Sequence, residues 1–144
     1  MIVVDACVAT KLFVDEAGSD AAARLVARYP LFLAPALITL EVTSAITRKA
    51  RNREIDRPAA ERALAAWREF LRLGNLRLTA DDALLVEAAG RSLDLAHPVA
   101  DCLYLALAAR EGVPLVTADG PFRDAVRGAF ADVRLLAEFD GGAA

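Results

Sequence analysis

Short apolar runs alternate with longer segments of helical periodicity along this chain. The apolar runs predict strands at residues 2–4, 31–35, 75–79, 113–117 and 133–136. The helical patterns predict helices at about 6–14, 20–28, 37–53, 58–73, 81–95, 98–112 and 121–130. Strands that alternate with helices indicate parallel pairing through βαβ units, with helices on both faces of the sheet. We therefore predict an α/β fold.

The length and composition fit one domain. The chain has 144 residues, 56% of them hydrophobic, and no internal repeat or linker. We expect the domain to span residues 1–140 and residues 141–144 to form a frayed tail. The sequence has no long charge-free apolar run and no basic leader, which predicts a cytoplasmic protein without a membrane segment. The formal net charge of −3 excludes a global basic field for nucleic acid.

Two aspartates lie just after predicted strands. Asp5 comes after the run IVV, and Asp119 lies two residues after LVT. The carboxyl ends of the strands form the ligand-binding edge of an open α/β sheet. Each aspartate also has a structural interpretation, Asp5 as a helix N-cap and Asp119 in an Asp-Gly turn.

Two further acids interrupt apolar helix faces. Glu41 has Leu37, Ile38 and Ala45 as its helical neighbours. Asp101 shares its face with Tyr104, Leu105 and Ala108, although its place in the first turn also suits the helix dipole. A carboxylate on such a face must be paired, protonated or bound to a metal.

Together the four acids predict an acidic cavity at one edge of the sheet. An all-oxygen donor set without convergent Cys or His suits Mg²⁺, with Mn²⁺ as the second choice. We expect the single histidine, His97, to be a helix-cap or surface residue rather than a ligand. Thr117 lies two residues before Asp119 and offers a supporting hydroxyl, or serves simply as a β-branched strand residue.

One basic segment stands out from the acidic average. Residues 47–57, TRKARNREIDR, hold five basic and two acidic side chains and so carry a net charge of +3. Arg48, Lys49 and Arg51 continue the predicted helix of Glu41, where they would contact phosphates beside the acidic cavity. A solvated helix end, with basic side chains favourable to the dipole, explains the same pattern.

Asp5 with its following helix, EVTSA at 41–45, ADCLYLALA at 100–108 and VTADGPF at 116–122 resemble the PIN-domain nucleases. The likeness is closest to the VapC-type ribonuclease toxins of bacterial toxin–antitoxin pairs, and it covers nearly the whole chain. By this resemblance, Asp5, Glu41, Asp101 and Asp119 are the catalytic, metal-binding acids. Cys7 departs from the pattern, because relatives often carry Ser at this point.

The resemblance implies a Mg²⁺-dependent endoribonuclease that hydrolyses phosphodiester bonds in single-stranded or loop RNA. It also implies a homodimer and a small antitoxin protein that inserts a segment over the acidic site. The alternative is a non-catalytic α/β signalling or interaction module of the phospho-receiver kind. That module requires paired acids after the first strand and a lysine after the last, and this sequence has neither.

Overall fold

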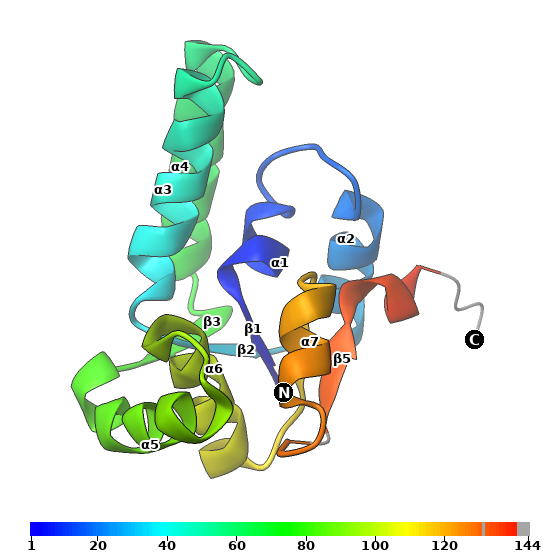
Figure 1. Cartoon of the computed structure of the whole chain (residues 1–144). Helices are drawn as coiled ribbons and strands as arrows, with labels where there is room; N and C mark the ends of the chain where they lie inside the picture. Colours follow the sequence, from blue (N-terminus) through cyan, green and yellow to red (C-terminus); the bar gives the residue numbers. More distant parts are fainter. Residues whose placement is uncertain (131, 141–144) are drawn as a thin grey trace.

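The computed structural model describes residues 1–130 and 132–140, so the expected tail at 141–144 lies outside the described residues. In order, the elements are β1 (Ile2–Val4), α1 (Ala6–Thr10), α2 (Ser19–Arg28), β2 (Phe32–Pro35), α3 (Ile38–Arg51), α4 (Arg57–Arg72), β3 (Leu76–Thr79), η1 (Asp81–Ala83), α5 (Leu85–Leu95), α6 (Val99–Glu111), β4 (Leu115–Thr117), α7 (Gly120–Val126), β5 (Val133–Leu135) and η2 (Leu136–Phe139). The predicted α/β fold is confirmed (Figure 1).

The five strands form one parallel sheet in the order β3-β2-β1-β4-β5. The central strand β1 is buried along its whole length, Ile2, Val3 and Val4 being at most 1% exposed. Because successive strand residues point to opposite faces, helices must cover both faces of the sheet at this point. Helix α6 packs on β1, β2 and β4.

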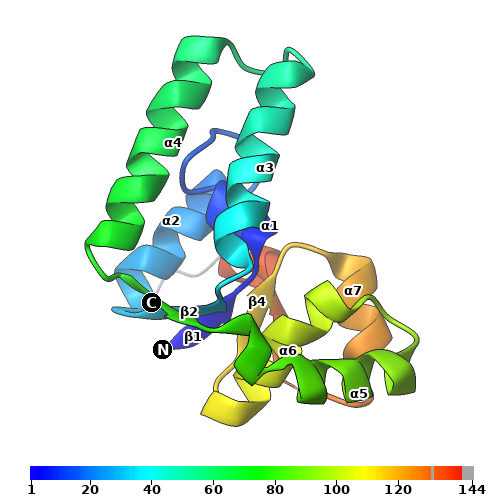
Figure 2. The same cartoon turned by 90° about the vertical axis from the view of Figure 1, so that its left-hand side faces the viewer.

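Helices α3 and α4 form an antiparallel hairpin that extends away from the sheet (Figures 1 and 2). Asp56 caps α4 by accepting a hydrogen bond from the Ala59 N–H at 2.8 Å. An aromatic cluster anchors the base of α4, where the Trp67 ring lies 5.4 Å from that of Phe13. No helix of the described residues is long and apolar enough to cross a membrane.

The structure divides the helix predicted over residues 81–95 into two elements. Residues 81–83 form a separate 3₁₀ turn, and α5 begins at Leu85 with no side-chain cap bond. Asp81 instead accepts a hydrogen bond from the Leu37 N–H at 3.0 Å, at the start of α3. This contact ties the helix of Glu41 to the segment after β3.

Candidate active site

Asp5 ends β1 and caps α1. Its Oδ1 accepts hydrogen bonds from the Val8 N–H at 3.0 Å and the Cys7 thiol at 2.8 Å. Burial raises the pKa of Asp5, and the negative charge of Asp101 raises it further. Hydrogen bonds to the carboxylate, including one from Thr117, lower the pKa but do not cancel the rise. The capping interpretation of Asp5 therefore holds, and it does not exclude a second role.

Glu41 lies in the first turn of α3, where Tyr104 of α6 reaches it. The Tyr104 hydroxyl donates a hydrogen bond to Oε2 of Glu41 at 2.5 Å, and the Tyr104 side chain is buried. Burial raises the pKa of Glu41, as do the charges of Asp101 and Asp5, while the Tyr104 hydrogen bond lowers it. The signal for Tyr104 was present in the sequence, because it lies one helical turn after Asp101.

Asp101 lies in the first turn of α6 and contacts the histidine that precedes this helix. The distance from His97 Nε2 to Asp101 Oδ2 is 2.8 Å. The His97 ring also stacks on Phe122, with 4.9 Å between ring centroids. The structure therefore places His97 beside the candidate site, a position that no pattern in the sequence indicates.

Asp119 follows β4 and caps α7. Its Oδ1 accepts a hydrogen bond from the Phe122 N–H at 2.9 Å, and its own N–H donates to the Thr117 hydroxyl at 3.0 Å. Thr117 is fully buried and lies 3.9 Å from the Cys7 sulfur. Thr117 therefore connects the segments that follow β1 and β4.

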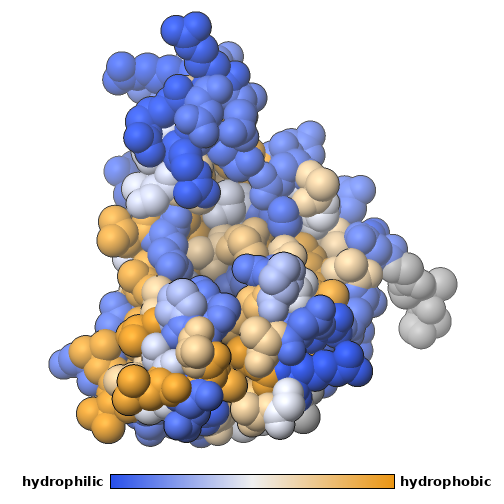
Figure 3. All heavy atoms as spheres, in the orientation of Figure 1, coloured by the Kyte–Doolittle hydropathy of each residue, from blue (hydrophilic) through white to orange (hydrophobic). Residues whose placement is uncertain are grey.

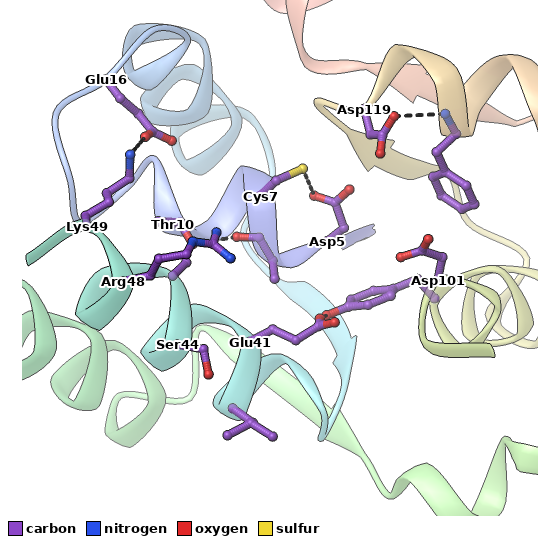
Figure 4. Close-up of a pocket in the computed structure, with 15 residues that line it drawn as sticks. Asp5, Cys7, Thr10, Glu16, Glu41, Ser44, Arg48, Lys49, Asp101 and Asp119 are labelled. Carbon is purple, nitrogen blue, oxygen red and sulfur yellow. Dashed lines mark hydrogen bonds and ion pairs between the residues drawn. The ribbon is translucent and has the colours of Figure 1, made fainter. Parts of the chain in front are cut away.

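All four acids line one cavity of about 500 Å³. Figure 4 shows Asp5, Asp101 and Asp119 around its acidic end, with Glu41 reaching in from α3. The structure thus brings together the four carboxylates that the sequence singled out. Their role in metal binding and catalysis stays a prediction.

The donor chemistry of this end suits a hard divalent cation. The acids provide only oxygen donors, and the mutual effects on pKa show that the negative charges oppose one another. Within residues 1–130 and 132–140, no three acidic, His or Cys side chains converge closely enough to hold a metal ion as they stand.

The other end of the cavity is basic. Arg48 and Lys49 line it, whereas the third residue expected to bind RNA, Arg51, is exposed and outside the lining. Lys49 Nζ pairs with Glu16 at 2.5 Å, and Lys11 pairs with the same carboxylate at 3.0 Å. Across the described residues, no carboxylate forms a salt bridge with Arg48.

The strand order and the cavity define a parallel α/β domain with an acidic site at the carboxyl edge of its sheet. Residues 2–128 match the family model of the PIN domain, so the chain belongs to the PIN-domain family. Proteins of this family generally use a divalent metal.

Two solved structures share the fold over nearly the whole chain. A toxin–antitoxin complex from Klebsiella pneumoniae superposes with a TM-score of 0.63 at 12% identity, covering 94% of this chain and 98% of the other. The toxin VapC20 of Mycobacterium tuberculosis, described as cleaving the sarcin–ricin loop, gives 0.66 at 21% identity, with 93% and 99% covered. Comparison with curated proteins gives no significant match.

Proposed function

We propose that this protein is a Mg²⁺-dependent endoribonuclease and the toxin of a type II toxin–antitoxin pair. The observation that carries the proposal is that Asp5, Glu41, Asp101 and Asp119 all line one cavity in a PIN domain. One structural neighbour is described as a toxin–antitoxin complex and the other as a toxin that cleaves the sarcin–ricin loop, which supports the same role here.

The four acids would hold Mg²⁺, or Mn²⁺ in its place. The cation would polarise the phosphodiester and lower the pKa of an attacking water. Tyr104 orients Glu41, and Thr117 fixes the backbone that carries Asp119. Arg48 would bind a substrate phosphate at the basic end of the cavity.

Single-stranded or loop RNA is the substrate that suits this cavity, because its phosphates can approach a recessed site. An antitoxin segment would cover the same cavity and exclude RNA in the cytoplasm. We also propose a homodimer, for which α5 offers an apolar surface: Val86 and Leu93 are 87% and 85% exposed.

The test is cleavage of an end-labelled RNA hairpin with a single-stranded tail by the purified protein. We expect cleavage with Mg²⁺ or Mn²⁺ and none in EDTA. Asp101→Asn should lose at least the roughly 10- to 100-fold that removing a hydrogen-bonding partner of a metal ligand costs. Asp82→Asn is the matched control, because Asp82 is exposed and outside the cavity lining, and it should cleave like the wild type. Equal cleavage by Asp101→Asn, or undiminished cleavage in EDTA, would overturn the proposal.

A further inference from the structure

His97 contacts Asp101 through one ring nitrogen, with 2.8 Å between Nε2 and Oδ2. An ionised carboxylate only accepts hydrogen bonds, and the imidazole tautomer with its proton on Nε2 provides the donor for it. His97 lies one residue before Pro98, the N-cap of α6, and Asp101 lies in the first turn of that helix. The histidine therefore contacts the carboxylate from the side of the preceding loop.

The position of His97 is itself fixed by its neighbours. Its backbone carbonyl accepts a hydrogen bond from the Ser92 hydroxyl at 2.5 Å, and its N–H donates to the Ser92 carbonyl at 3.2 Å. The preceding residue, Ala96, ends α5 in the left-handed conformation, with φ of 50°. The end of α5 thus fixes the backbone of His97 independently of the contacts that its ring makes.

The ring of His97 also links Asp101 to the segment that holds Asp119. It stacks on Phe122 with an interplanar angle of 28°, and Phe122 lines the cavity at the start of α7. The Phe122 N–H donates to Oδ1 of Asp119 at 2.9 Å. One stacked pair of rings therefore connects Asp101 on α6 with Asp119 at the start of α7.

Oδ2 of Asp101 is occupied by this hydrogen bond, and the carboxylate points toward the space that Asp5 and Asp119 also face (Figure 4). A carboxylate held by one oxygen loses fewer conformations when its other oxygen binds a cation. Partners of this kind beside metal ligands commonly change metal affinity by about 10- to 100-fold when they are removed.

We propose that His97 is a positioning residue for metal binding: its Nε2–H fixes Asp101, and its stacking on Phe122 sets the direction of that hydrogen bond. This inference rests on the proposed function, because it concerns the same acidic site. It assigns His97 neither a direct metal contact nor a proton transfer.

Two variants separate the hydrogen bond from the stacking. His97→Phe keeps an aromatic ring against Phe122 but has no donor for Asp101, whereas His97→Gln keeps an amide donor but has no aromatic ring. The measurement is Mn²⁺ titration of the metal-free protein, with free Mn²⁺ followed by electron paramagnetic resonance. A melting curve in EDTA reports the fold of each variant independently.

We expect His97→Phe to melt close to the wild type in EDTA but to bind Mn²⁺ about 10- to 100-fold more weakly. His97→Gln should bind Mn²⁺ more tightly than His97→Phe but more weakly than the wild type, because its amide donor is no longer held in direction by stacking on Phe122. Wild-type affinity in His97→Phe, or weaker binding in His97→Gln than in His97→Phe, would overturn the inference and leave the ring a packing residue. Asp101→Asn separates the two proposals: if it binds Mn²⁺ as the wild type does, the proposed metal site itself fails.

Discussion

A single side chain, Asp5, combines a structural and a chemical role in this molecule. Its Oδ1 caps α1, while its charge lies near that of Asp101 in a partly desolvated site. Capping needs only a side-chain oxygen, which Asn also provides. Metal binding needs the charge. The substitution Asp5→Asn therefore separates the two roles.

We predict that Asp5→Asn in EDTA at neutral pH melts at or above the wild-type temperature, yet loses RNA cleavage by at least about 100-fold. Burial raises the pKa of Asp5 in the folded state. The contribution of this group to stability is therefore fully present below its ordinary pKa of about 4, and it is lost as the pH rises through the raised pKa. The advantage of the variant should thus shrink toward pH 4. Melting curves between pH 4 and 8 measure this trend. A variant that melts earlier at neutral pH and still cleaves RNA would leave Asp5 a purely structural residue.

The residue scale also shows what sequence patterns could and could not predict. Asp5, Glu41 and Asp101 stood out because acids at those positions conflict with local strand or helix patterning. His97 did not stand out, because its significance depends on Phe122, which is 25 positions further along the chain. A pattern that spans only one element carries no information about such a contact.

At the scale of elements, α3 carries both ends of the cavity. Glu41 and Arg48 are two turns apart on one face, a separation of about 10 Å along the helix. Lys49 is adjacent to Arg48 in sequence, but its charge is offset by Glu16. Within the predicted basic cluster, Arg48 is therefore available to bind phosphate, whereas Lys49 holds the loop before α2 through Glu16.

We predict that Arg48→Ala weakens RNA binding and lowers the slope of log affinity against log salt by roughly 0.7 for each phosphate that the variant no longer neutralises. Lys49→Ala should change this slope less and instead destabilise the fold by about 1 kcal/mol, because Glu16 loses one of its two partners. Fluorescence anisotropy at several salt concentrations, in an Asp101→Asn background that prevents cleavage, provides the slopes. Arg51→Ala serves as the control outside the cavity. Equal slopes for Arg48→Ala and Arg51→Ala would contradict the assignment.

Element positions were largely predictable from sequence, whereas contacts between elements were not. The strands and long helices follow from apolar periodicity, which each segment carries by itself. The hydrogen bond from the Leu37 N–H to Asp81 crosses 44 positions, and no pattern within either segment indicates it. The strand order with β1 at the centre likewise depends on pairings between distant segments.

At the scale of the whole molecule, one apolar surface is left uncovered. Figure 3 shows hydrophobic residues gathered over α5, at the lower left, while the α3–α4 hairpin is mostly hydrophilic. Val86 and Leu93 are two turns apart on α5, and Leu85 of the same helix is also exposed. This surface supports the proposed homodimer.

We predict that the 15.3 kDa chain sediments at twice its mass and that Val86→Glu combined with Leu93→Glu shifts it to the monomer. Charges placed in an apolar interface must be desolvated without partners, which opposes association. Val26→Glu on α2 is the matched control, because Val26 is also an exposed apolar residue but lies on another helix. Analytical ultracentrifugation measures the mass. An unchanged mass in the double variant would remove α5 from the interface.

The central place of β1 also determines when the cavity forms during synthesis. Residues 2–4 leave the ribosome early, but their partner strand β4 begins at Leu115. Asp5 and Asp119 are 114 positions apart, which corresponds to roughly 6–23 s of translation. A nascent chain that has not reached Asp101 lacks half of the acid set. The proposed nuclease therefore cannot assemble its site on the ribosome that is making it until most of the chain has been synthesised.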